Sequence, residues 1–292
     1  VDWFISRGPG DEAVAKIDIP TLFVQGTVDT LFTLDEAARN TAVLQDHDVP
    51  TAMLWFCGGH GTCLTKSGDG DRVGRASFNW LDHYLKGAPL EPVPALDLID
   101  QDGERWSAQE WPVAEGEPLT ADGSGTLDLK ADGGSGGDPA ALDIDPNDPL
   151  GGLVASITPT KAANAVDVAI DPGDTDALAL GAPKLSLTYS GELTGDVSRS
   201  DTRVFAQIVD DETGLVLGNQ ITPIEVTLDG ERHDTEVDLE MIAHHITPGH
   251  GLTLQLVAAT SAYGIPTLDG TITFDRIDLS IPTADAKAVT QG

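Results

Sequence analysis

The sequence predicts an α/β segment over residues 1–88, followed by an antiparallel β-sandwich over residues 89–283 and a tail over residues 284–292. Two continuous apolar runs in the first segment are separated by a stretch with helical spacing. This order is typical of a strand, helix and strand in a parallel sheet. Three prolines then follow a second helical stretch, and beyond them short alternating runs recur between Gly, Asp and Pro turns, which favours a sandwich.

The first predicted strand follows Pro20 and ends near Gly26. Its apolar run is continuous, which favours a strand buried on both faces of the sheet. A helix is expected over residues 34–45, opened by a Thr-x-x-Glu capping box at Thr33. Ligand chemistry in open α/β sheets gathers at the carboxyl ends of the strands. Asp29, just past this strand, is therefore a candidate for such chemistry.

The second predicted strand contains the apolar residues 52–54 and leads into a glycine-rich turn that carries His60. Glycine tolerates positive φ and lets a substrate or another backbone come close, so the turn presents the imidazole into a cleft. His60 is the leading candidate for a catalytic base, with Asp29 as its acid partner. For either residue alone, a plain turn aspartate or loop histidine is the better interpretation. The two together, each at a strand end, favour the catalytic one.

The two cysteines of the chain, Cys57 and Cys63, lie on either side of His60. A disulfide between them would hold the histidine turn rigid and would imply an oxidising compartment. Two free thiols are a second possibility. A third is a zinc site made of both thiolates and His60, although this spacing is not among the usual zinc patterns and no further cysteine is available. No metal site and no cofactor is predicted.

The formal net charge is −32, from 48 acidic and 16 basic residues. This charge argues against nucleic-acid backbones and anionic lipid surfaces as partners. No apolar run reaches the roughly 18 residues of a membrane-spanning helix. The chain begins inside a pattern and without methionine, so we interpret it as a fragment, a processed chain or one piece of a nicked protein.

The second helix is expected over residues 72–86, capped by Asp71 and ended by Gly87. Beyond it, period-two alternation between turn residues marks the candidate strands of the sandwich. These are residues 95–99, 126–130, 185–189, 203–209, 221–228, 233–239, 252–259 and 271–279.

Three further patterns are interpreted as structural. Ser135 lies in a formal Gly-x-Ser-x-Gly match, but its flanks lack the strand and helix of a nucleophile elbow, and residues 123–137 are expected to be a mobile loop. The acidic run from Asp143 to Asn147 lacks the glycine and glutamate of a calcium loop. Three histidines near a Pro-Gly turn are interpreted as turn and loop residues: His244, His245 and His250.

Taken together, these features resemble the C-terminal half of the cocaine-esterase and Xaa-Pro dipeptidyl-peptidase type of serine hydrolase. The matching stretches are Pro20–Asp29, Gly58–Gly61, Phe78–Gly87, Trp106 with Trp111-Pro112, Asp145–Gly152 and Pro248–Leu252. The resemblance implies the C-terminal portion of an α/β-hydrolase parallel sheet, followed by a jelly-roll β-sandwich that packs beside the active site.

The resemblance also implies a chemistry. The triad of such enzymes runs Ser, Asp, His along the chain, so Asp29 and His60 match the acid and the base, and the serine would lie upstream. The substrate would be a small ester, amide or peptide, and the missing N-terminal hydrolase portion, in the same or a separate chain, would be a partner. This chain alone would be inactive.

Two other functions remain open from the sequence. The sandwich could be a binding module for carbohydrate or a partner protein, since jelly rolls occur in lectins. The chain could also be a subunit or propeptide that completes the site of another chain. A disulfide together with the acidic charge would suit an extracellular or cell-envelope location.

Overall fold

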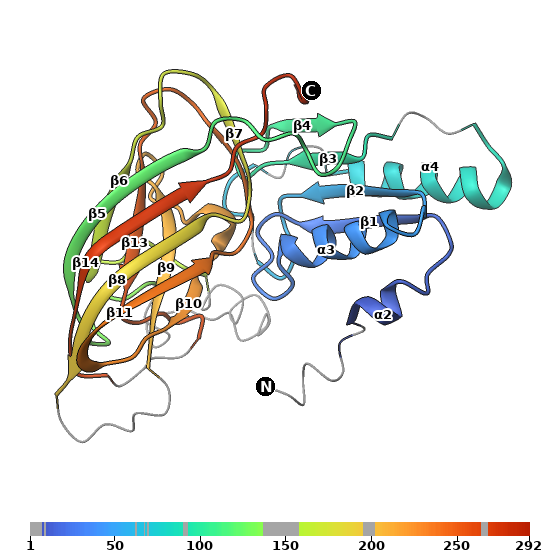
Figure 1. The fold of residues 1–292 in the computed structure, drawn as a ribbon. Coiled ribbons are helices and arrows are strands. Elements are labelled where there is room, and N and C mark those ends of the chain that lie inside the picture. The colour runs from blue at the N-terminus through green and yellow to red at the C-terminus, as the bar shows by residue number, and fades with distance from the viewer. Residues whose placement is uncertain are drawn as a thin grey trace, which may run out of the picture.

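The computed structural model describes residues 8, 10–61, 63–66, 68, 70–89, 93–136, 158–194, 202–263 and 268–292. The chain forms a five-stranded mixed sheet with helices, beside a β-sandwich (Figure 1). A short helix, α2 (Gly10–Val14), precedes the first strand. The predicted fold class, an α/β sheet followed by a sandwich, is confirmed.

The five-stranded sheet has the order β1-β2-β3-β4-β15. Its strands are β1 (Thr21–Gly26), β2 (Thr51–Phe56), β3 (Leu96–Ile99), β4 (Arg105–Ala108) and β15 (Val289–Gln291). The pairs β1–β2 and β2–β3 are parallel, whereas β3–β4 and β4–β15 are antiparallel. The sheet therefore continues past the expected boundary at residue 88, and the expected tail supplies its last strand.

The two longer helices of this segment occupy their predicted ranges, α3 over Leu34–Gln45 and α4 over Arg72–Lys86. Helix α3 packs Leu34 against the face of the sheet that carries Met53 and Trp55. Successive strand residues point to opposite faces, and α4 lies over Leu22 and Leu54, on the other face. One helix thus covers each face, as a strand-helix-strand unit requires.

Two local predictions for this segment were wrong. The Thr33 side chain makes no capping hydrogen bond, because its hydroxyl lies 3.4 Å from a carboxylate oxygen of Asp35 instead. The strand β1 is not buried on both faces, since it lies at the end of the sheet and the side chain of Val24 is 39% exposed. Both errors arise from partners that a local pattern does not contain.

The sandwich consists of two four-stranded antiparallel sheets, with the orders β10-β9-β13-β6 and β11-β8-β14-β5. Large apolar side chains from both sheets, such as Leu254 of β13 and Phe274 of β14, fill one shared core. The strands of the first sheet are β6 (Ala165–Ile170), β9 (Arg203–Asp210), β10 (Thr222–Glu225) and β13 (Leu252–Val257). Those of the second are β5 (Leu119–Asp128), β8 (Lys184–Leu193), β11 (Asp229–Asp238) and β14 (Gly270–Ile281).

A separate pair of strands, β7 (Ala177–Gly181) and β12 (Ile242–Ile246), links the sandwich to the five-stranded sheet. Leu180 of β7 and Ala243 of β12 belong to the same apolar cluster as Leu96 and Trp106 of the sheet. This cluster fixes the sandwich against the α3 side of the sheet, close to the carboxyl ends of its parallel strands (Figure 1).

The structure corrects two further expectations in the sandwich. Residues 123–128 of the expected mobile loop at residues 123–137 belong to strand β5, in which glycines alternate along one face. A Cβ added at Gly123 would lie 2.7 Å from Val168, so these glycines let β5 pack closely on β6. His244 and His245 lie on strand β12, and only His250 lies in a turn.

The acidic run from Asp143 to Asn147, and with it the matching stretch Asp145–Gly152, lies outside the described residues. Among the described helices, none combines the length and the apolar character needed to cross a membrane.

Candidate active site

The parallel pairing of β1 and β2 brings two loops to one edge of the sheet. Gly26 at the end of β1 is in register with Phe56 at the end of β2, and the amide of Thr27 donates to the carbonyl of Phe56 at 2.8 Å. Asp29 follows the first strand by three residues and His60 follows the second by four. The two side chains therefore leave neighbouring strands at the same height.

Close backbone approach makes glycine necessary in these loops. A Cβ added at Gly26 would lie 2.0 Å from the carbonyl oxygen of Gly58. At Gly59 the backbone has φ of 121°, and a Cβ there would lie 2.6 Å from Asp29 Oδ2. An L side chain rarely adopts this backbone conformation, and no space exists for it here. The glycines around His60 therefore let its loop close down onto Asp29.

The structure brings the two predicted site residues together. His60 Nδ1 lies 3.0 Å from Asp29 Oδ2 and 3.2 Å from Asp29 Oδ1. The side chain of Asp29 is 7% exposed, whereas that of His60 is 54% exposed. The ring of Phe32 meets the imidazole edge-on, with 5.3 Å between the ring centroids. The carboxylate is thus enclosed, and the imidazole is held on one side and open on the other.

The local backbone keeps Asp29 ionised. Asp29 Oδ1 accepts hydrogen bonds from the amides of Leu31 and Phe32, both at 2.9 Å. Burial raises the pKa of Asp29. These two amide hydrogen bonds, together with those from the side chain and backbone of His60, lower the pKa by more than burial raises it, so the net pKa lies below its ordinary value. An anionic carboxylate beside Nδ1 is therefore present at neutral pH.

This arrangement determines what the histidine can do. A carboxylate at Nδ1 selects the tautomer that carries its proton there, which leaves Nε2 free to accept a proton. The same carboxylate stabilises the imidazolium that then forms. Within the described residues, no hydroxyl or thiol lies within hydrogen-bonding distance of His60. The described part of the site thus consists of an acid and a base.

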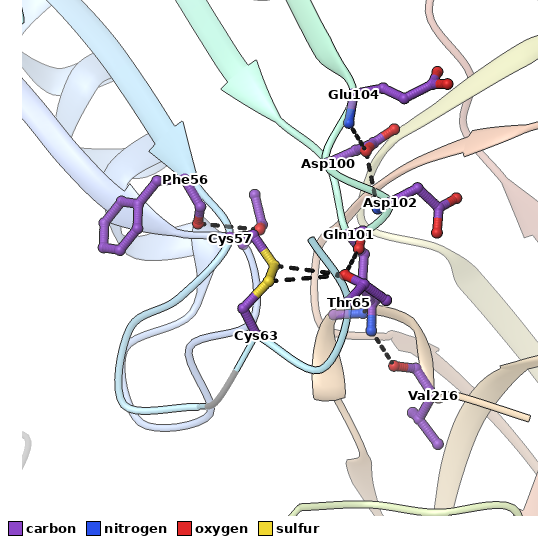
Figure 2. Close-up of a disulfide and its surroundings, with 11 residues drawn as sticks. Phe56, Cys57, Cys63, Thr65, Asp100, Gln101, Asp102, Glu104 and Val216 are labelled. Carbon is purple, nitrogen blue, oxygen red and sulfur yellow. Dashed lines mark hydrogen bonds between the residues drawn. A yellow bond between two sulfur atoms is a disulfide. The ribbon is translucent and has the colours of Figure 1, made fainter. Parts of the chain in front are cut away.

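Cys57 and Cys63 are joined by a disulfide, with 5.3 Å between their Cα atoms (Figure 2). Of the three possibilities left by the sequence, the disulfide is the one present, and neither free thiols nor a thiolate zinc site is formed by these two cysteines. The hydroxyl of Thr65 contacts both sulfurs and donates to the carbonyl of Gln101 after β3. The bridge therefore closes the histidine loop and connects it to the next strand of the sheet.

Sequence reasoning missed one residue of the site, Gln220. Its Nε2 donates to the backbone carbonyl of Asp29 at 2.7 Å. The two residues are 191 positions apart, and Gln220 lies in a short apolar stretch of the sandwich with no motif around it. No local pattern could have found this contact.

The formal Gly-x-Ser-x-Gly match has a structural role, as expected. Ser135 is 2% exposed, and its hydroxyl donates to Gln207 Oε1 at 2.6 Å and accepts from the amide of Thr160 at 3.2 Å. Across the described ranges, no group of three or more His, Cys, Asp or Glu residues could hold a metal ion.

Solved structures with the same fold exist at low sequence identity. An aminopeptidase from a marine sediment Thaumarchaeota archaeon matches with a TM-score of 0.63 and 13% identity, over 94% of this chain and 57% of that one. A CocE/NonD family hydrolase from Staphylococcus aureus matches with a TM-score of 0.59 and 13% identity, over 97% of this chain and 57% of that one. No protein-family model and no curated sequence matches.

The resemblance predicted from the sequence is thereby confirmed as a likeness of fold. At this level of identity the comparison concerns the fold alone, and the chain spans a little over half the length of the structures it matches.

Proposed function

We propose that these residues form the acid and base portion of a serine hydrolase that cleaves ester or amide bonds. The observation that carries the proposal is the contact between His60 Nδ1 and Asp29 Oδ2 at the carboxyl ends of two neighbouring parallel strands. The fold shared with an aminopeptidase and a CocE/NonD family hydrolase supports it. The chain order of acid and base is that of α/β-hydrolases.

In this proposal His60 Nε2 removes the proton of a serine hydroxyl as the serine oxygen attacks the carbonyl carbon of the substrate. His60 then gives the proton to the leaving alcohol or amine, and water releases the acyl group by the same steps. Asp29 holds the ring and stabilises its positive charge. The serine is supplied by a segment outside the described residues, in the same or a separate chain.

The distribution of exposed apolar side chains supports such a further segment. Of the eleven large apolar side chains that are exposed among the described residues, ten lie between Ile17 and Leu85, and only Tyr263 lies in the sandwich. Strand β1 also has a neighbour on one side only. Exposed apolar groups gathered on one part of a surface mark a protein interaction site. The same distribution does not favour a carbohydrate-binding face on the sandwich.

Substitution of His60 in the whole protein tests the proposal. We expect His60→Ala to abolish hydrolysis of a nitrophenyl ester and to leave the thermal unfolding midpoint nearly unchanged, because the side chain is half exposed. Asp29→Asn should lower kcat by up to about 10⁴-fold, because the amide favours the wrong tautomer. His47→Ala, at an exposed position after α3, is the matched control and should keep full activity. Retained turnover in His60→Ala would refute the proposal.

A further inference from the structure

The β-sandwich reaches the candidate active site through residues 216–220, which we call the docking segment. This segment includes a short 3₁₀ turn, Leu217–Asn219, and ends at Gln220 before strand β10. Gly218 and Asn219 both have left-handed backbone conformations, with φ of 64° and 54°. Asn219 is 1% exposed. A residue other than glycine keeps this conformation only where its surroundings enforce it, and such residues cluster at functional sites.

Gln101, just past β3, holds the docking segment in this shape. Its Nε2 donates to the carbonyl of Val216 at 3.1 Å, and its Oε1 accepts from the amide of Gly218 at 2.8 Å. Its own carbonyl accepts the hydroxyl of Thr65 from the disulfide loop (Figure 2). Gln101 is 3% exposed, so both ends of its amide are engaged inside the protein.

The docking segment in turn touches both loops of the candidate site. Gln220 Nε2 donates to the carbonyl of Asp29 at 2.7 Å, and Gln220 is 8% exposed. A Cβ added at Gly61 would lie 3.3 Å from the Asn219 side-chain nitrogen, and one added at Gly218 would lie 3.4 Å from the carbonyl oxygen of Thr27. The loop after β1 that carries Asp29 and the loop after β2 that carries His60 therefore both lie against the docking segment, at Gly218, Asn219 and Gln220.

We infer that Gln220 is a positioning residue for the Asp29–His60 pair, and that the docking segment is a built part of the active site. The inference rests on the proposed function and goes further, because it assigns a catalytic purpose to the sandwich. The side chain of Asp29 is oriented by the amides of Leu31 and Phe32. Its backbone carbonyl accepts from Gln220. Without that donor, the carbonyl of this buried residue would have no hydrogen bond from the described residues, so the loop would shift to reach water.

Two variants of the whole protein test this role, with a matched control. Gln220→Met and Gln220→Glu keep the length of the side chain and remove the amide donor. Gln207→Met is the control, because Gln207 is another buried glutamine of the sandwich whose Nε2 donates to a backbone carbonyl, that of Thr160 at 2.9 Å. Gln207 contacts neither loop of the site in the described residues. All three variants should lower thermal stability.

Only the Gln220 variants should change the site itself. We expect kcat for a nitrophenyl ester to fall about tenfold to a hundredfold with KM within about twofold, since a misplacement of about 1 Å can cost about a hundredfold in rate. The Nδ1–H proton of His60, observed by NMR with ¹⁵N-labelled histidine, should lose its hydrogen-bonded downfield position in both Gln220 variants and keep it in Gln207→Met.

The two readouts separate this inference from the proposed function. A wild-type kcat and an unchanged His60 signal in both folded Gln220 variants would overturn the positioning role, even where His60→Ala abolishes hydrolysis. An altered signal in the Gln220 variants would support the positioning role even where His60→Ala leaves hydrolysis intact and the hydrolase proposal fails. An equal change in Gln207→Met would reduce Gln220 to a general contribution to stability and would also overturn the inference.

Discussion

Asp100, in the turn after β3, is a carboxylate enclosed by protein, with 0% of its surface exposed. Its Oδ1 accepts the amides of Asp102 at 3.0 Å and Glu104 at 2.9 Å. Burial and the negative charges of Asp102 and Glu104 raise its pKa, whereas the two amide hydrogen bonds lower it. The net pKa is about 6. At neutral pH the protein therefore holds a buried negative charge that an unfolded chain would expose to water.

This pKa predicts that Asp100→Asn stabilises the protein at neutral pH. The folded pKa lies above the ordinary value of 3.8, so wild-type stability falls as pH rises from about 4 through about 6, and the asparagine variant lacks that fall. We expect a gain of about 1–3 kcal/mol in unfolding free energy at pH 8 and none at pH 4. Urea unfolding at both pH values measures it. Asp171→Asn, an exposed aspartate that accepts the amide of Gly173, is the control. An equal gain at pH 4 and pH 8 would contradict the electrostatic explanation.

Single residues of the candidate site could be predicted where the pattern that marks them lies within a few positions of the sequence. Asp29 and His60 could be found because an apolar strand, a glycine and a polar side chain follow one another within a few positions. The contact between Gln220 and Asp29 could not, because it joins a turn of the sandwich to a loop 191 residues earlier. The shifted pKa of Asp100 likewise depends on enclosure by the fold. Sequence patterns locate the candidate side chains, and only the folded chain shows which contacts hold them in position.

At the scale of elements, helix α4 and strand β1 have surfaces that the described residues leave uncovered. Phe78 and Leu85 of α4 are 70% and 76% exposed, and Val24 of β1 is 39% exposed. A helix normally buries its apolar stripe against a neighbour. Here Trp80 is buried and donates to the carbonyl of Pro20, so the helix already uses one side for the sheet. The remaining apolar side chains fit the proposal of a further hydrolase segment packed over them.

Truncation of these side chains in the whole protein tests that packing. If a further segment covers α4, Phe78→Ala and Leu85→Ala should each lower the unfolding free energy by about 2–5 kcal/mol, as buried apolar side chains do. An uncovered α4 would make each change worth less than about 0.5 kcal/mol. Tyr263→Ala, at an exposed apolar position of the sandwich, is the comparison. Chemical denaturation of the three variants decides between a covered and an open face.

Prediction of elements succeeded where the pattern was long and local. Helices α3 and α4 have three or four turns of helical spacing, and their predicted ranges are confirmed. Strands β4, β6, β7, β12 and β15 were not predicted, because they are short and form only by pairing with strands far away in the sequence. The glycines of β5 indicated a loop, yet the same lack of side chains lets that strand lie against the valines of β6.

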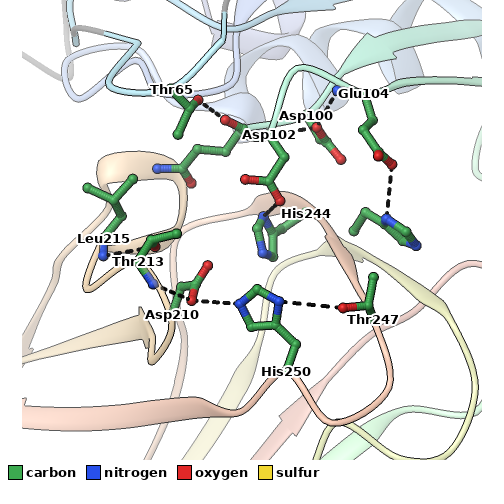
Figure 3. Close-up of polar contacts among 12 residues, drawn as sticks. Thr65, Asp100, Asp102, Glu104, Asp210, Thr213, Leu215, His244, Thr247 and His250 are labelled. Atoms are coloured by element: carbon green, nitrogen blue, oxygen red, sulfur yellow. Dashed lines mark hydrogen bonds and ion pairs between the residues drawn. The ribbon is translucent and has the colours of Figure 1, made fainter.

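At the scale of the whole molecule, histidines of the sandwich meet carboxylates where the two parts of the chain join (Figure 3). His245 of β12 has Nδ1 at 3.0 Å from Glu104, beside β4, and Nε2 at 3.3 Å from Asp176, before β7. His244 Nδ1 lies 4.0 Å from Asp102. Burial lowers the pKa of His244 by more than the negative charge of Asp102 raises it. In a protein of net charge −32, the His245 ring thus lies between two carboxylates.

His250 lies between two further carboxylates at this junction. Its Nε2 lies 2.8 Å from Asp210 Oδ1 (Figure 3). Its Nδ1 lies 3.2 Å from Glu212 Oε2. The hydrogen bond to Asp210 raises the pKa of His250, burial lowers it, and the charges of Asp210, Glu212 and Asp102 raise it again, for a net increase. The charge of His250 in turn contributes to the lowered pKa of His244. The hydrogen bond to His250 also helps to lower the pKa of Asp210 against its burial.

These shifts predict a pH window for the stability of the junction. Because the pKa of His250 is raised on folding, its contribution to stability is complete below about pH 6.5 and is lost as the pH rises through the folded pKa. Because the pKa of Asp210 is lowered on folding, its contribution to stability is lost only below about pH 3.9. His250→Gln should therefore lower the thermal midpoint by about 2–4 °C at pH 5.5, a shift that corresponds to about 1 kcal/mol in a protein of this size, and by little at pH 9. His47→Gln, at an exposed position after α3, is the control. Because His244, His245 and the facing carboxylates are present in both proteins, the difference between wild type and His250→Gln isolates the effect of the His250 ring. A decrease in thermal midpoint that is the same at pH 5.5 and pH 9 would show that His250 acts by packing and not by charge.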